Sequence, residues 1–227
     1  MPSGALLDLL AGIEEVRDLQ LANPTPLRGL PVRSSVVRAI NRSSVVLLTS
    51  HFERYLRGLN EEAVDAINAS PIAGTLLPEA LRLQHSRTAV DGMLETQWKN
   101  RSIQLQIFAK QDSWLWGNAP KGDLEADRLL RWMRSPSPDR VKKVFGMWGV
   151  DDIFSRVTRV PHQRARFWTK LDELVDKRNR IAHGDRTTGA TFQEISSYLA
   201  VVREFCTRAD RIMARAVSQH VGTVAPW

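Results

Sequence analysis

Hydrophobic residues recur along this chain at the spacing of amphipathic helices, and no convincing pair of strands is present. A first helix is expected over Leu6 to Val16, with Ser3 as its N-cap. Pro31 is suited to begin a long second helix. We expect that helix to stop at Gly58-Leu59-Asn60, because Asn60 can cap a short helix of its own.

The middle of the chain is less regular. Pro78 opens a helix whose apolar positions run to Leu94, and aromatic residues are then scattered through 97–118. Residues 123–134 predict a short amphipathic helix, and Pro138 begins another that ends near Gly146. The seven tryptophans could stack on bases, but tryptophan at helical spacing is more often part of a core.

The last third is the most regular part. One helix is expected over 162–183, with Gly184 in the position that ends helices. Thr191 and Glu194 fit a capping box that opens the final helix. The pattern predicts an all-α helical bundle with antiparallel neighbours. We expect one domain over 1–227, with a core at about 30–215 and an N-terminal helix and loop at 1–29.

Composition narrows the class of protein. A hydrophobic content of 43% and a charged content of 25% are those of a globular chain. The single cysteine, Cys206, excludes an internal disulfide and a cysteine-based zinc site, and its apolar neighbours predict a buried thiol. No signal peptide and no apolar run long enough to span a membrane are recognisable, so a cytoplasmic protein is expected.

Charge points to a polyanionic partner. The net charge is +7, and residues 156–186 carry nine Lys or Arg against four Asp or Glu. A basic zone of this kind favours nucleic acid, although it is equally compatible with a solvated helix face.

The most informative stretch is 177–185, which reads KRNRIAHGD. Arginine can hold a phosphate through its fork of N–H donors, and histidine can move protons near neutral pH. Arg178, Asn179 and His183 therefore form a minimal set of groups for cleaving a phosphodiester without a metal. Related spacings occur at Arg215 to His220 and Arg156 to His162.

A purely structural interpretation remains open at this stage. His183 could cap the helix, and Arg178 could form a surface ion pair with Asp172 or Glu173. A metal site on His183 and Asp185 lacks further ligands nearby, so neither a metal nor another cofactor is expected. No nucleophile elbow and no Walker or Rossmann glycine pattern is present.

Helix 171–184 resembles the signature helix of the HEPN superfamily, and more narrowly of its RiboL-PSP-HEPN-type branch. Segments 138–154 and 47–59 are similar to other parts of that branch, so the resemblance spans about 30–215. It implies a HEPN-like helical bundle with additional helices, acting as a metal-independent endoribonuclease. The branch paired with nucleotidyltransferase antitoxins has a tyrosine two residues after the histidine, where this chain has Asp185.

Carried over to this chain, the resemblance makes Arg178, Asn179 and His183 the catalytic set. It further implies a toxin or antiphage (abortive-infection) effector, with RNA as substrate and an antitoxin or other defence protein as partner. RNA-binding residues are expected in the surrounding basic zone: Lys177, Arg180, Arg186, Arg164 and Arg166.

A homodimer is expected on geometric as well as familial grounds. Arg178 and His183 diverge by about 140° around one ideal helix. In a site composed from two copies, the two side chains of one copy need not converge on the same point. The alternative function is a non-catalytic HEPN-like module that binds RNA or a protein.

Overall fold

The computed structural model describes residues 1–22, 34–222 and 226–227, which form helices and turns without a strand. The all-α prediction is confirmed. The helices are α1 (Gly4–Leu21), α2 (Ser34–Ala69), α3 (Glu79–Glu95), α4 (Arg101–Gln111), α5 (Ala126–Leu130), α6 (Pro138–Met147), α7 (Ile153–Val157), α8 (Pro161–Ala182) and α9 (Phe192–Val221). Short 3₁₀ turns lie at Gly74–Leu76, Trp98–Asn100 and Ser113–Leu115.

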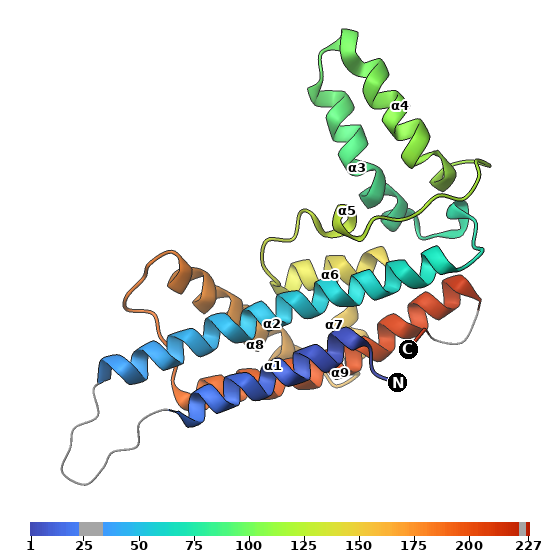
Figure 1. Ribbon diagram of the computed structural model, residues 1–227. Helices are drawn as coiled ribbons and strands as arrows, with labels where there is room; N and C mark the ends of the chain where they lie inside the picture. Colours follow the sequence, from blue (N-terminus) through green and yellow to red (C-terminus); the bar gives the residue numbers. More distant parts are fainter. Residues whose placement is uncertain (23–33, 223–225) are drawn as a thin grey trace, which may run out of the picture.

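Helices α1, α2 and α9 lie side by side as long rods, and α6, α7 and α8 pack around them (Figure 1). The predicted cap of α1 is confirmed, because the Ser3 hydroxyl accepts from the Leu6 N–H at 3.0 Å. That hydroxyl also donates to Asp210 on α9, while Glu62 on α2 accepts from the N–H groups of Gly4 and Ala5. The start of α1 is thereby held to both neighbours.

Aromatic contacts between α2 and the C-terminal helices fill the core. Phe205 on α9 packs edge-on against Phe52, and the Tyr55 hydroxyl donates to the Cys206 carbonyl at 3.0 Å. Cys206 is fully buried, as predicted. Burial raises the pKa of both the Cys206 thiol and the Tyr55 hydroxyl well above their usual values.

The predicted end of the second helix was wrong: α2 runs through Gly58-Leu59-Asn60 to Ala69. A Cβ on Gly58 would come within 3.1 Å of the Ala5 side chain, so this glycine permits close packing of α1 on α2. Asn60 is buried, donates to the Ala126 carbonyl and accepts from the Trp148 indole N–H at 3.2 Å. Both residues serve tertiary packing rather than a helix end. The predicted start at Pro31 lies outside the described residues.

The helix predicted over 123–134 is reduced to α5 because tertiary contacts hold its first residues in another conformation. His85 is fully buried, with its Nδ1 2.7 Å from an Asp112 carboxylate oxygen and its Nε2 accepting from the Glu125 N–H at 2.9 Å. Arg128 donates to the second Asp112 oxygen at 2.8 Å. Helices α4 and α7 were not predicted.

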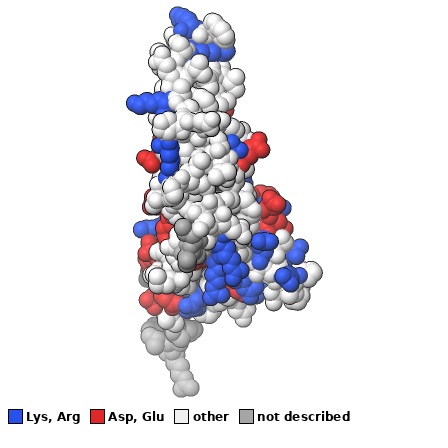
Figure 2. All heavy atoms as spheres, turned by 90° about the vertical axis from the view of Figure 1, so that its right-hand side faces the viewer, with Lys and Arg blue, Asp and Glu red and all other residues white. Residues whose placement is uncertain are grey.

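Helices α3 and α4 form a hairpin that projects from the side of the bundle, over the C-terminal half of α2 (Figure 1). Most of the hairpin surface seen in Figure 2 is uncharged, with Lys and Arg at its tip. No residue of α4 is buried. Trp98 at the tip is 81% exposed, so the core prediction is wrong there, whereas it is confirmed for Trp114 and Trp148.

Candidate active site at the end of α8

The candidate site lies at the C-terminal end of α8, where a glycine ends the helix as predicted. Gly184 has φ +85°, a left-handed conformation that glycine adopts without a Cβ clash. Its N–H bonds the Ile181 carbonyl at 3.1 Å, and the Asp185 N–H bonds the Arg180 carbonyl at 3.0 Å. These two bonds define a Schellman motif, which satisfies the last carbonyls of the helix.

The last turn of α8 remains helical, because the His183 N–H still bonds the Asn179 carbonyl at 2.9 Å. Asn179 and His183 therefore share a face of the helix, and Arg178 projects about 140° away from His183. Arg178 turns toward its neighbour instead, donating to the Asn179 side-chain oxygen at 3.2 Å. The structure thus brings Arg178 and Asn179 together within one chain, and His183 stands apart.

The ion pair considered for Arg178 is absent from the described part of the chain: Glu173 is held by Lys170 at 2.6 Å, and Asp172 is exposed. Arg178 is half-buried and uses only one of its five donors within the described residues. His183 occupies the C-cap position, yet its exposed imidazole bonds nothing in the described ranges. Free donors and a free imidazole are what an incoming phosphodiester requires.

Asp185 organises the loop that follows α8. Its carboxylate accepts from the hydroxyl and N–H groups of Thr187 and Thr188, at 2.6 to 3.1 Å. Those hydrogen bonds, that from the Thr187 hydroxyl foremost, hold the pKa of Asp185 far below its usual value. Arg180 completes the arrangement with an ion pair to the same carboxylate at 3.0 Å. Asp185 is therefore a fixed anion in the turn beside His183.

Arg42 on α2 is a positioning residue that the sequence did not reveal. Its guanidinium donates to the carbonyls of Asp185 and Thr188, at 2.6 and 2.7 Å. These bonds anchor the loop after α8 to the N-terminal half of α2. No local signal could have identified this arginine, because its partners lie more than 140 residues away in the sequence.

The predicted RNA-binding residues occupy different settings along α8. Lys177 is paired with Glu194 at 2.6 Å, and Arg166 with Glu204 at 3.4 Å. Arg186 is exposed and has no ion pair within the described ranges. Arg164 is half-buried near the start of α8, so it and Arg166 lie roughly 25 to 30 Å along the helix from His183.

The other two Arg–His spacings sit in different surroundings. His220 near the end of α9 has its Nε2 3.1 Å from the Trp148 carbonyl and is half-buried. Arg156 and His162 are separated by the break between α7 and α8. Only the stretch at 178–183 presents an unbonded histidine immediately before a glycine helix end, among the described residues.

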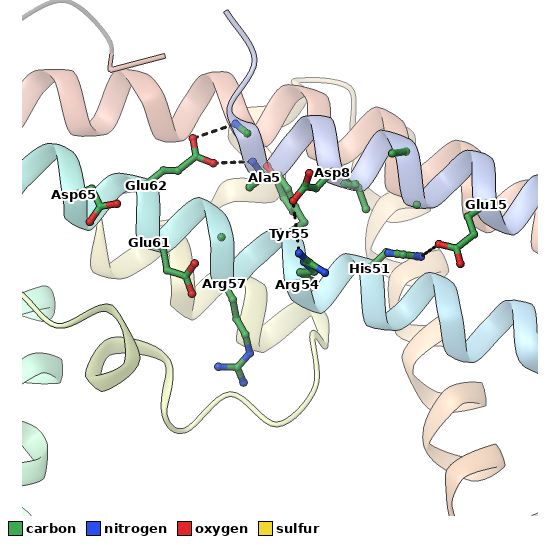
Figure 3. A pocket seen from close by; sticks show the side chains of 15 residues that line it. Ala5, Asp8, Glu15, His51, Arg54, Tyr55, Arg57, Glu61, Glu62 and Asp65 are labelled. Atoms are coloured by element: carbon green, nitrogen blue, oxygen red, sulfur yellow. Dashed lines mark hydrogen bonds and ion pairs between the residues drawn. The ribbon is translucent and has the colours of Figure 1, made fainter.

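A groove of about 700 Å³ between α1 and α2 is lined by acidic residues and lies away from this site (Figure 3). Figure 3 shows Arg54 directed to Asp8 and His51 to Glu15, and Arg57, which points away from both, is paired with Glu53 at 3.2 Å. Its acidic side chains are Asp8, Glu15, Glu61, Glu62 and Asp65. A phosphate would be repelled there. No cluster of three or more potential metal ligands occurs in the ranges that the structure describes.

The helical bundle and the Arg-Asn-x-x-x-His stretch at a glycine helix end are those of a HEPN-type protein. The family model for RiboL-PSP-HEPN matches residues 7–215, and the chain belongs to this family. No curated protein and no solved structure matches the chain.

Membership of this family points to an RNase or RNA-binding function. Among the described helices, none has the length and apolar character needed to cross a membrane.

Proposed function

We propose that this protein is a metal-independent endoribonuclease whose site contains Arg178, Asn179 and His183. The observation that carries the proposal is the end of α8, where the family's motif presents a free imidazole at His183 and, on another side of the helix, an arginine with unused donors. The contacts to RNA are assigned to the surrounding basic residues: Lys177, Arg180, Arg186, Arg164 and Arg166.

The proposed reaction is attack of the RNA 2′-hydroxyl on the adjacent phosphorus. The proton of that hydroxyl passes to a base, the bond from phosphorus to the 5′ oxygen breaks, and that oxygen takes up a proton. The products are a 2′,3′-cyclic phosphate and a 5′-hydroxyl. His183 supplies the acid–base catalysis, worth roughly 10²–10⁴-fold. Arg178 stabilises charge that develops on the phosphoryl oxygens, and Asn179 orients the Arg178 guanidinium through their hydrogen bond.

The site is proposed to be completed by a second copy of the chain. Within one chain, the intact last turn directs Arg178 and His183 to different sides of α8. Two copies meeting at this end would supply two imidazoles, one to accept the 2′ proton and one to protonate the leaving oxygen. Repulsion between the two arginine clusters is reduced because Arg180 is already neutralised by Asp185.

Cleavage of RNA in EDTA tests the proposal. The wild-type protein is expected to cleave RNA and to leave DNA intact. His183→Ala and Arg178→Ala are each expected to lose the cleavage of RNA. The matched control is His162→Ala, which removes an exposed histidine from the other end of the same helix. An absolute requirement for Mg²⁺, or full activity in His183→Ala, would overturn the mechanism.

Mixing inactive variants tests the shared site. If each site draws groups from both chains, combining His183→Ala with Arg178→Ala subunits restores part of the activity that each variant lacks alone. A fully active monomer would refute the shared site while leaving the chemistry of the single chain in place.

The second candidate is a non-catalytic module that binds RNA or a protein. It is favoured by one observation: no side chain in the described ranges orients the His183 ring. Binding of RNA that is unchanged in His183→Ala, without cleavage of any RNA, would select this alternative.

We further propose that the nuclease is a toxin or antiphage effector acting in the cytoplasm and controlled by a partner protein. Toxicity on expression that disappears in His183→Ala supports this role. Harmless expression of a chain that cleaves RNA in vitro contradicts it.

A further inference from the structure

The α3–α4 hairpin carries an apolar stripe that nothing in the described chain covers. On α3, Leu83, Val90 and Leu94 are 54%, 39% and 70% exposed. An ideal helix places these three within about 40° of one another around its axis. Arg87 lies on the same stripe, and the positions repeat with the alternating three- and four-residue steps of a coiled-coil seam. A stripe with this spacing is suited to pack against a partner helix.

The charges beside the stripe identify the partner. Arg87 forms an ion pair with Asp91 on the same helix at 3.1 Å, and both side chains are about half exposed. A two-fold axis through the middle of the stripe, between residues 88 and 89, would bring two copies of α3 together in antiparallel orientation. Measured along the helix axis, the positions of Arg87 in one copy and Asp91 in the other then differ by only about 1.5 Å. Two ion pairs become one network of four alternating charges.

The same axis also matches the apolar residues. It sets Leu83 of one copy opposite Leu94 of the other, at equal height along the helices. Leu83 and Val90 border a groove of about 430 Å³ that has Phe108 and Trp116 on its other side. Leu94 is the most exposed member of the stripe, and it would enter this groove. Parallel pairing would instead place Arg87 against Arg87, so like charges exclude it.

We propose that the exposed face of α3 is a self-association surface that pairs with α3 of a second copy in antiparallel orientation. The hairpin rises from the C-terminal half of α2, whereas the end of α8 lies against its N-terminal half (Figure 1). The pairing therefore does not depend on the proposed nuclease site and can coexist with a dimer formed there.

Charge exchange tests the pairing with the full chain. Arg87→Glu alone and Asp91→Arg alone each place like charges together and should lower the mass measured by sedimentation equilibrium. Mixing the two variants restores opposite charges across the axis and should restore the mass. Leu83→Glu should dissociate the pair, whereas Leu7→Glu, at a leucine of equal exposure on α1, should not.

Cross-linking tests the register, since the native Cys206 is buried. An oxidised mixture of Leu83→Cys and Leu94→Cys chains should form disulfide-linked pairs, and Leu94→Cys alone should not. Linkage of Leu94→Cys alone would show parallel pairing and overturn the proposal. So would a mass that none of the hairpin variants changes. Capture of a monomeric chain by phosphatidylglycerol–phosphatidylcholine vesicles, lost in Leu83→Glu, would show that lipid covers this face instead.

Discussion

The end of α8 and the face of α3 are both exposed, but different forces shape them. At the end of α8, polar groups are closely bonded: Arg42 and Asp185 bind the following loop, and Lys177 binds Glu194. What remains available there is the His183 imidazole and the donors of Arg178 that its bond to Asn179 does not use. On α3 the unpartnered groups are apolar side chains. The surface proposed for chemistry therefore differs from the one proposed for association in which groups remain without a partner: polar donors and an imidazole at the first, apolar side chains at the second.

The largest expected effect separates the two surfaces completely. His183→Ala should lower RNA cleavage roughly 10²–10⁴-fold and leave association through α3 unchanged. Leu83→Glu should remove that association and leave cleavage per site unchanged, because the hairpin lies far from α8. Cleavage rates and sedimentation masses of the same samples give both readings. Loss of cleavage in Leu83→Glu would show that the two surfaces are coupled.

A stability effect of about 1–2 kcal/mol is expected at the turn that ends α8. Gly184→Ala places a Cβ on a residue with φ +85°, which an L-residue adopts only with strain. Gly189→Ala is the control, since a Cβ there meets nothing within 4 Å and its φ is not left-handed. Urea unfolding of both variants measures the difference. Equal stability of the two would contradict the strain argument.

The ends of α8 and α9 could be predicted because their signals are local. The bonds at Gly184 and Asp185 that end α8 reach back at most five positions, and the predicted capping box at Thr191 and Glu194 is confirmed. The continuation of α2 through Gly58 and Asn60 could not be predicted, since its cause lies in Ala5, Ala126 and Trp148.

The candidate site likewise contains one contact that the sequence could predict and one that it could not. The contact between Arg178 and Asn179 joins neighbours in the sequence, so the motif placed them together. The support from Arg42 arises only in the folded chain. The unpartnered face of α3 was present in the sequence as apolar positions from Leu81 to Leu94, but only the structure shows that most of them face outward.

A smaller effect is expected on RNA affinity. Arg186 has no ion pair among the described residues, so its charge is available to a phosphate. Arg186→Ala should weaken binding to single-stranded RNA several-fold and lower the slope of log affinity against log salt by about 0.7. Arg17→Ala, which removes an arginine already paired with Glu14 on α1, should change neither quantity. Equal effects of the two variants would argue for binding by net charge alone.

The smallest expected effect concerns the electrostatic bonds between α8 and α9. The Lys177 ammonium, through its hydrogen bond, and the Thr191 N–H hold the pKa of Glu194 below its usual value of 4.5. A lowered pKa in the folded state gives stability that is present above pH 4.5 and is lost as the pH falls through the folded-state pKa. Glu194→Gln keeps the acceptor of the capping box and removes the charge. Because the Glu194 side chain is 38% exposed, the wild-type advantage at neutral pH should stay below about 1 kcal/mol. Urea unfolding of both proteins across pH should show this advantage disappearing in acid, and an advantage that grows as the pH falls would show that the carboxylate does not stabilise this end of the bundle.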